Sequence, residues 1–280
     1  MEAALEHDTE WLHVVAATLN WGDKSLANNA SALKRLFFLG HFERSVLDIS
    51  ERKLLDALKL IPNPNSRAVV FSTLILMRRC AERCVSQLER GRVLLKDVIE
   101  THRKVMRAGL ELYSKEEMAS AIEESAKTDP VRCAILILFE QLGCRVLDLG
   151  GWVTTDKTRA EASESNVYVP RAKDVLVIRR CYKTVSTYGV KRDIIRGERG
   201  RLLRRCLLVL EGGALIRLKG GSQCPRAQLS ARVTEISGVS ATKSFKSYVN
   251  IMRKAGDIEG IRALAEKRGT DIRTALVHYA

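Results

Sequence analysis

The chain has 280 residues, enough for two domains that each bury a core, and 47 lysines and arginines outnumber 33 aspartates and glutamates. The net charge of +14 favours a polyanionic partner, because cationic side chains displace counterions from a phosphate backbone. Seven scattered cysteines do not fit a disulfide framework and indicate a reducing compartment. The sequence contains no apolar run of about 18 residues and no signal-peptide pattern, so we expect no membrane association.

The first part of the chain predicts helices only. Apolar residues recur at helical spacing over residues 11–19, 25–38 and 54–60. The proline-rich segment 61–65 ends the third helix, and Ser66 is the expected cap of the next, which runs to about residue 88. These patterns predict a bundle of four or five helices as a first domain, residues 1–108.

The second domain, residues 109–280, predicts a mixture of helices and strands. Ser114 and Glu117 form a capping-box pattern, and Asp129-Pro130 begins an apolar helix that ends at Gly143. Residues 166–170 and 174–178 are rich in strand formers, and residues 185–195 are a weaker strand candidate. Helices resume near residues 199, 225, 242, 257 and 271. The predicted fold class is therefore mainly α with a small antiparallel sheet of two or three strands.

Residues 179–206 contain ten lysines and arginines against two acidic residues, with tyrosines interleaved. Such a segment can line a phosphate backbone, although a solvated charged face is the ordinary alternative. The DNA-contact candidates are Arg179, Arg180, Lys191, Arg192, Arg204 and Arg205.

Two residues are candidates for phosphate chemistry: Arg145, which precedes this basic segment, and Lys183, which lies within it. Arg145 follows an apolar helix and a glycine, where packing can hold its guanidinium for bidentate contact with phosphate. The alternative is an ion pair with Asp148, three residues later. Lys183 lies in a predicted hairpin, and a lysine there can donate a proton to a leaving oxygen.

Three more candidates lie in the last forty residues. Lys243 and Lys246 share one turn of a predicted helix, either as a phosphate site or as a solubilising surface. Tyr279 ends the last helix, where a tyrosine usually packs or frays. Its phenol becomes a useful nucleophile only where cations stabilise the developing phenolate. The cysteine and histidine spacing predicts no metal site, and the glycine pairs do not form a phosphate loop.

The ordered set of an arginine, a hairpin lysine, two further cations and a terminal tyrosine resembles the tyrosine recombinase (phage integrase) family. Gly143-Cys144-Arg145 with Asp148 matches the segment of the first catalytic arginine, and Lys183-Thr184 matches the sheet lysine. Lys243-Ser244-Phe245-Lys246 corresponds to the family's H-x-L-R box, and Gly269-Thr270 followed by Tyr279 matches the C-terminal motif.

The departures from the pattern are substitutions at cationic positions. Lys246 stands in place of the second arginine, Lys243 in place of a histidine, and Thr270 in place of a second histidine or tryptophan. Arg268 or Arg273 is a candidate to supply the missing guanidinium.

The resemblance implies a DNA-clamping (SAM-like) helical domain followed by a catalytic domain. It implies a site-specific recombinase or integrase that joins DNA through a 3′-phosphotyrosyl intermediate, with no metal or cofactor. The implied partners are double-stranded DNA and further copies of the chain, as a tetramer on DNA. The expected location is the cytoplasm or nucleoid, or the nucleus of a eukaryotic host. Two alternatives remain open: an impaired recombinase-fold protein that binds DNA, and an unrelated nucleic-acid packaging protein.

Overall fold

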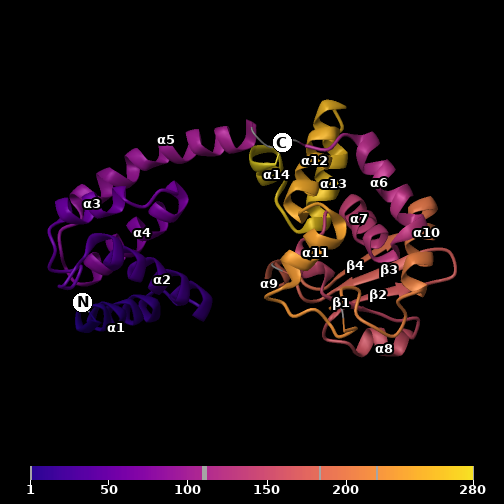
Figure 1. The fold of residues 1–280 in the computed structure, drawn as a ribbon, viewed down its shortest axis with the longest axis horizontal. Helices are drawn as coiled ribbons and strands as arrows, with labels where there is room; N and C mark the ends of the chain where they lie inside the picture. The colour runs from indigo at the N-terminus through magenta and orange to yellow at the C-terminus, as the bar shows by residue number, and fades with distance from the viewer. Residues whose placement is uncertain (1, 109–111, 183, 219, 280) are drawn as a thin grey trace. The chain divides into compact units, whose positions relative to one another are not determined.

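The computed structural model describes residues 2–108, 112–182, 184–218 and 220–279. The chain divides into two compact units, Met1–Glu111 and Leu112–Ala280 (Figure 1). Within the described residues, no helix is long and apolar enough to cross a membrane.

The first unit is a helical bundle, as the apolar spacing predicts. Its helices are α1 (Glu2–Thr18), α2 (Asp23–Gly40), α3 (Glu51–Lys59), α4 (Pro64–Cys80) and α5 (Ser86–Ala108). Leu12, Leu33, Leu58 and Leu74, one from each of the first four helices, are fully buried in one core. Because each helix turns one apolar stripe inward, the bundle closes around these leucines.

The cap of α4 differs from the expectation. The side chain of Asn63, and not that of Ser66, caps the helix, and it accepts hydrogen bonds from the backbone N–H groups of Asn65 and Ser66. Pro64 occupies the first helical position, where its missing N–H costs nothing. The helix therefore begins two residues earlier than the position of Ser66.

The second unit combines a four-stranded sheet with helices. Two long helices come first, α6 (Lys115–Thr128) and α7 (Pro130–Leu142), with the expected capping box at Ser114 and N-cap at Asp129. The sheet region holds η1 (Val146–Leu149), β1 (Gly151–Val153), α8 (Lys157–Ala162), β2 (Asn166–Pro170), β3 (Val175–Arg179), α9 (Val185–Tyr188) and β4 (Lys191–Ile195). The remaining helices are α10 (Gly197–Leu208), α11 (Leu229–Ser237), α12 (Ala241–Lys254), α13 (Ile258–Arg268) and α14 (Ile272–His278).

The sheet is mixed, which corrects the expected two or three antiparallel strands. Its order is β1-β2-β3-β4, with β1 parallel to β2 and the other pairs antiparallel. Strand β1 has only three residues, too few to show a period of two in the sequence. The segment expected as a strand over residues 185–195 begins instead with the short helix α9, and only its second half is β4.

Strand β2 is covered on both faces of the sheet and is buried along its whole length. Val167, Val169 and Ile178 pack with Ala160 of α8, whereas the alternate residue Tyr168 belongs to the main core beneath α7. Figure 1 shows α8 on one side of the strands and α7 on the other. This layered arrangement supports the loops that leave the strands, including the β3–β4 connection that carries several candidate residues.

Candidate active site

The C-terminal end of α13 collects four polar side chains from two other regions of the second unit, the turn at Arg145 and the β3–β4 hairpin. The last carbonyl groups of a helix have no partners within the helix and carry partial negative charge, so they attract cations. Lys191 Nζ donates to the carbonyls of Glu266 and Lys267, the latter at 3.3 Å, and Arg179 Nη2 donates to the Lys267 carbonyl at 2.6 Å. Arg145 Nη1 donates to the Arg268 carbonyl at 2.8 Å. Arg145 Nη2 and Thr184 Oγ1 both donate to the Gly269 carbonyl, at 3.2 Å each. One helix end therefore joins the Arg145 turn, the hairpin and the segment that leads to Tyr279.

Arg145 is placed by the end of α7. Gly143 adopts the left-handed conformation (φ 56°) that ends the helix, and Arg145 then begins the short helix η1. The backbone N–H of Arg145 donates to Asp148 Oδ2 at 2.8 Å, so the carboxylate fixes the turn. The guanidinium extends instead to the α13–α14 connection, where Nη2 also donates to Thr270 Oγ1 at 2.9 Å. Arg145 and Thr270, both candidates from the sequence, therefore contact each other.

Arg179 forms a buried ion-pair network and is not a DNA contact, which corrects its assignment to the phosphate-binding set. Its side chain is wholly buried, with Nη2 2.6 Å from Asp193 Oδ2 and Nη1 3.5 Å from Asp148 Oδ2. A guanidinium held between two carboxylates inside the domain cannot reach a phosphate on the surface. Its role is to join β3, β4 and η1.

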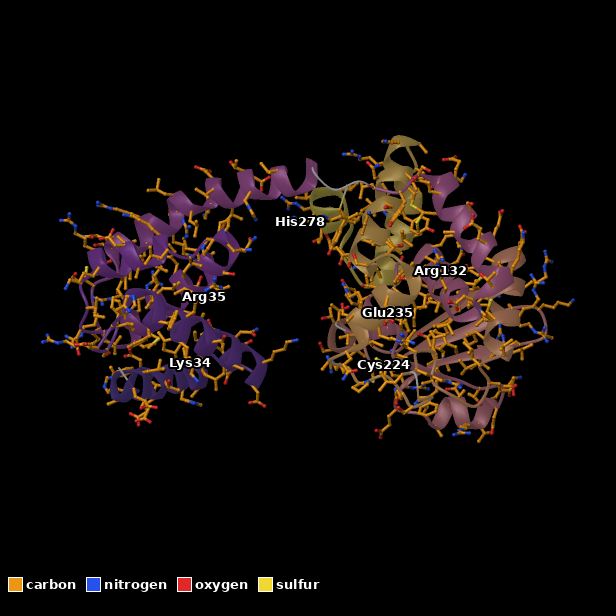
Figure 2. All side chains as sticks on the ribbon, viewed as in Figure 1. Lys34, Arg35, Arg132, Cys224, Glu235 and His278 are labelled. Carbon is orange, nitrogen blue, oxygen red and sulfur yellow. The ribbon has the colours of Figure 1, made fainter. Side chains whose placement is uncertain are left out.

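Tyr279 follows α14, whose last residue is His278 (Figure 2), and its side chain is half-buried. Its ring packs edge-to-face on Phe245 of α12, with centroids 5.0 Å apart and planes at 82°. The Arg268 guanidinium lies 4.1 Å from the Phe245 ring centroid and 5.6 Å from that of Tyr279. Of the two candidates for the missing guanidinium, Arg268 therefore lies beside the tyrosine.

Arg268 is buried, with 3% of the residue's surface exposed. Its Nη1 donates to the carbonyl of Gly143, and its own carbonyl accepts from Arg145. Burial, followed by the positive charge of Arg145, lowers the pKa of Arg268. Two guanidinium groups thus lie near the end of α13, one bonded to the residues that lead to the tyrosine and the other beside its ring.

The remaining lysines of the predicted set have different positions. Lys183 lies outside the described residues, although its neighbour Thr184 contacts Gly269. Lys243, in the first turn of α12, places its ammonium 4.3 Å from the ring centroid of Tyr113. Lys246 is half-buried on the same helix, directly after Phe245. The structure thus links Arg145, Thr270 and Tyr279 through α13, and it directs Lys243 toward Tyr113.

Lys191, at the start of β4, is a partly buried cation of the hairpin. Its ammonium lies 5.1 Å from the ring centroid of Tyr188 and 5.9 Å from that of Tyr182, in addition to the α13 carbonyls. Burial, followed by the charge of Arg179, lowers the pKa of Lys191. Lys191 therefore ties β4 to α13.

The other predicted DNA contacts are closer to solvent. Arg192 is half exposed and pairs with Glu161 at 2.7 Å. Arg180 is mostly covered and donates to the carbonyl groups of Ala160 and Glu161. On α10, Arg205 is exposed, and Arg204 donates to a carbonyl in the β2–β3 turn. Arg192 and Arg205 are the members of this set that present their charge most openly.

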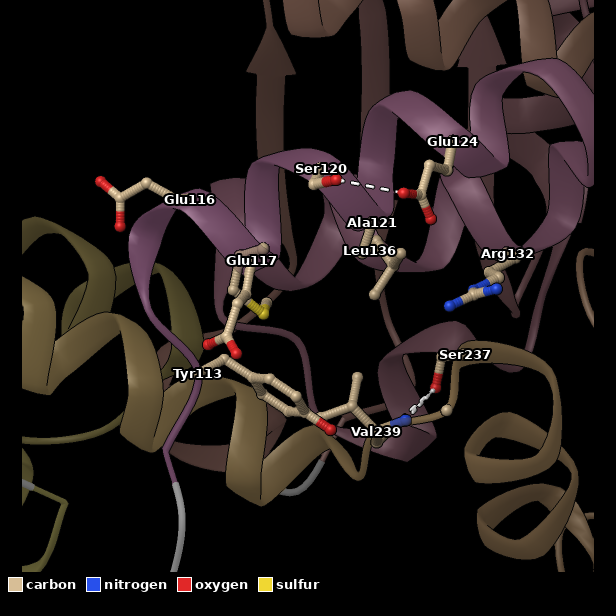
Figure 3. A pocket seen from close by; sticks show the side chains of 12 residues that line it. Tyr113, Glu116, Glu117, Ser120, Ala121, Glu124, Arg132, Leu136, Ser237 and Val239 are labelled. Atoms are coloured by element: carbon tan, nitrogen blue, oxygen red, sulfur yellow. Dashed lines mark hydrogen bonds between the residues drawn. The ribbon is translucent and has the colours of Figure 1, made fainter.

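A pocket of about 540 Å³ lies elsewhere in the second unit, between α6 and the α11–α12 turn (Figure 3). Glu116, Glu117 and Glu124 line it together with Tyr113 and Arg132. Its three carboxylates would repel a phosphate, so this pocket is not the nucleic-acid site. Among the described residues, no group of three or more histidine, cysteine or acidic side chains is arranged to hold a metal ion.

The fold is that of the tyrosine recombinases. A structure of a lambda integrase dimer bound to a COC′ core site is similar over 96% of this chain and 76% of that chain, with 16% sequence identity and a TM-score of 0.51. A structure of lambda integrase (75–356), also a dimer bound to a COC′ core site, matches over 94% of both chains, with 15% identity and a TM-score of 0.50. Comparison by sequence finds no matching family model and no matching curated protein.

Proposed function

We propose that this protein is a tyrosine-type DNA strand transferase, a site-specific recombinase or integrase whose nucleophile is Tyr279. The observation that carries the proposal is the link between Arg145 and the segment before the tyrosine, through Arg268, Gly269 and Thr270. This link holds the Arg145 guanidinium, which has the geometry for bidentate phosphate binding, and the phenol on one framework, and it supports the proposal together with the fold shared with the lambda integrase dimers.

In the proposed reaction, the Tyr279 oxygen attacks a scissile phosphorus in line. The phosphorus–oxygen bond to the 5′ oxygen breaks as the 3′-phosphotyrosyl bond forms, and the phenol proton passes to solvent. Arg145 donates hydrogen bonds to the non-bridging oxygens, where charge accumulates in the transition state. Lys183, beside Thr184, gives a proton to the leaving 5′ oxygen. The phosphotyrosyl bond keeps the energy of the phosphodiester, so a second DNA end can reverse the reaction.

The proposed substrate is duplex DNA, and the proposed assembly is a homo-oligomer, a tetramer when two duplexes are exchanged. The charge of +14 and the exposed Arg192 and Arg205 support a phosphate-rich partner. The lambda integrase structures contain dimers on DNA, which supports assembly on the substrate.

A second candidate function is DNA binding without cleavage. The observation that favours it is the position of Lys243, whose ammonium lies over Tyr113. Arg145 also donates three hydrogen bonds within the protein, and two of them end on backbone carbonyl groups. In this case the same fold recognises DNA but lacks the cations that activate a tyrosine.

Covalent trapping separates the two functions. Duplexes selected from a random pool by binding to the protein are prepared with a nick close to each possible cleavage position, so that the short released strand diffuses away. A strand transferase gives an adduct that survives denaturing electrophoresis. Trypsin cleavage after Arg273 then yields a peptide that begins at Thr274 and carries the nucleotide on Tyr279.

Two variants control the trapping experiment. Tyr279→Phe should give no adduct and should bind the same duplexes with nearly unchanged affinity, because only the attacking oxygen is lost. Arg145→Ala should lower the cleavage rate about 100- to 1000-fold, as the loss of one transition-state donor does elsewhere. Binding by the wild-type protein without an adduct on any selected duplex would favour the second function, and cleavage by Tyr279→Phe would refute the nucleophile.

A further inference from the structure

Arg268 is a buried cation without a carboxylate partner among the described residues. Its guanidinium donates to the carbonyls of Gly143 and Cys144, and its Nε has no hydrogen-bond partner there. Arg179, the comparably buried arginine nearby, pairs with both Asp148 and Asp193. Burying a charge without a counter-ion is costly, so the position of Arg268 requires a compensating interaction.

The compensation in the free protein comes from two aromatic rings. The guanidinium lies 4.1 Å from the centroid of Phe245 and 5.6 Å from that of Tyr279, both within cation–π range. The two rings also contact each other edge-to-face, so the three side chains form one cluster. Within the cluster only Tyr279 carries a group that can become negatively charged.

We propose that Arg268 is a positioning residue for Tyr279, which holds the phenol ring against Phe245 and stabilises the negative charge that develops on its oxygen during strand transfer. This inference rests on the proposed function. It assigns the second cation of the site to the end of α13, and not to Lys246 in α12. The buried guanidinium acts through the tyrosine and leaves direct contact with the phosphate to Arg145.

The position in the fold explains how this cation is kept in place. The carbonyl of Arg268 accepts from Arg145 Nη1 at 2.8 Å, and its Nη1 returns to the carbonyl of Gly143, two residues before Arg145. Arg145 thus holds the backbone of Arg268, and Arg268 holds the backbone that leads into Arg145, so a shift of either residue is expected to move both. Arg273, the other candidate, lies exposed in the first turn of α14, and its side chain lacks such anchors among the described contacts.

The experiment compares Arg268→Met, Arg268→Lys and the matched control Arg262→Met. Arg262 belongs to the same helix but is exposed and pairs with Glu259. At a saturating concentration of the nicked trapping duplex, Arg268→Met should lower the single-turnover cleavage rate about 100-fold. The dissociation constant for the same DNA should change less than about twofold. Arg268→Lys, which retains the charge, should recover about tenfold of this loss. Arg262→Met should match the wild-type rate.

A second measurement does not depend on cleavage. With 3-fluorotyrosine incorporated at position 279, the ¹⁹F spectrum of the free protein reports the surroundings of the ring. Arg268→Met should move this resonance, and Arg262→Met should leave it in place. An unmoved resonance in Arg268→Met overturns the inference whether or not the wild-type protein cleaves DNA.

The combined outcomes separate this inference from the proposed function. If the wild-type protein gives no adduct but the fluorine resonance moves only in Arg268→Met, the strand-transferase function fails and the contact with Tyr279 stands. If the wild-type protein cleaves and Arg273→Met is slow while Arg268→Met is normal, the cation is Arg273 and the inference is wrong. If circular dichroism shows that Arg268→Met does not fold, the Arg268→Lys variant decides. A fluorine resonance and a cleavage rate in Arg268→Lys that both equal those of wild type would contradict a requirement for the guanidinium.

Discussion

Arg145 Nη2 lies 2.9 Å from Thr270 Oγ1, although 125 positions separate the two residues in the chain. The bond crosses from the turn after α7 to the connection before α14, so it sets the distance between the Arg145 side chain and the helix that precedes Tyr279. Thr270 stands where the resemblance places a histidine or tryptophan, and here its hydroxyl accepts a hydrogen bond from the arginine.

Thr270→Val should therefore slow cleavage more than it weakens binding. Valine keeps the shape of threonine but cannot accept from Nη2, and a hydrogen bond to a charged group contributes about 1.5–3 kcal/mol. We expect a fall in the single-turnover rate of at least about tenfold, which corresponds to the lower end of that range. Thr270→Ser retains the hydroxyl and is the control. Equal rates for the valine and serine variants would show that the bond does not orient Arg145 during the reaction.

Arg179 should be important for stability and unimportant for the salt dependence of DNA binding. Arg179→Met leaves the carboxylates of Asp148 and Asp193 without their buried cation, and breaking such a pair costs about 3–5 kcal/mol. Urea unfolding at neutral pH measures this loss. The comparison is Arg192→Met, at an exposed position, which should change the free energy of unfolding by less than about 0.5 kcal/mol.

The salt dependence of DNA binding should change when Arg192 is replaced and should not change when Arg179 is replaced. If Arg192 contacts a phosphate, its removal lowers the slope of log affinity against log salt by about 0.9, whereas Arg179→Met leaves the slope unchanged wherever the protein is folded. A lower slope in Arg179→Met would contradict the burial of its guanidinium.

Local sequence patterns predicted the parts of the fold that depend on short-range chemistry. The capping box at Ser114, the N-cap at Asp129 and the helix end at Gly143 are all present, because side-chain caps and left-handed glycines act within a few residues. The turn that carries Arg145 follows directly from them. Strand β1 could not be predicted, because three residues are too few to show the alternation of a strand. Its pairing partner β2 also follows it only after the intervening helix α8.

The errors in the candidate site have a different cause, because they depend on contacts between distant segments. A count of charges along residues 179–206 cannot show that Asp148 and Asp193 enclose Arg179. The sequence proposed Arg268 or Arg273 equally, since only the packing of α12 against α13 places Phe245 beside the former. The sequence therefore indicates candidate cations but not which of them is buried and which is exposed.

The pKa of Lys191 gives a prediction for the pH dependence of stability. Burial and the charge of Arg179 lower this pKa in the folded protein below the ordinary lysine value of 10.5. Between the folded and unfolded pKa values the unfolded state binds more protons, so the contribution of Lys191 to stability rises with pH in that window. Below the folded pKa the full cost of burying the ammonium is present. The free energy of unfolding of wild type relative to Lys191→Met should thus increase as the pH rises toward 10.5.

Urea unfolding of both proteins at several pH values up to 10 measures this difference. Lys254→Met, at an exposed position at the end of α12, is the control and should show a pH-independent difference from wild type. A difference for Lys191→Met that falls with pH would mean that the contacts with the α13 carbonyls outweigh burial and raise the pKa.

Gly269, at the end of α13, contacts Thr184 of the hairpin between β3 and β4. Replacing Gly269 should therefore affect both the end of the helix and the position of the hairpin. Its φ of 68° is in the left-handed region, and a Cβ atom there would lie 2.6 Å from Thr184 Oγ1. Gly256 has the same kind of backbone, with a φ of 72°, but a Cβ atom would have no neighbour within 4 Å. Gly256→Ala therefore measures the backbone strain alone, about 1–2 kcal/mol of unfolding free energy.

Gly269→Ala should be less stable than Gly256→Ala, because Thr184 must also move away and lose its 3.2 Å hydrogen bond to the Gly269 carbonyl. Since Thr184 follows Lys183 directly, we also expect the cleavage rate at saturating DNA to fall in Gly269→Ala and to remain at the wild-type value in Gly256→Ala. Urea unfolding and single-turnover cleavage test the two parts separately. Equal stability and equal rates in the two variants would show that the approach of Thr184 to Gly269 does not hold the hairpin at the site.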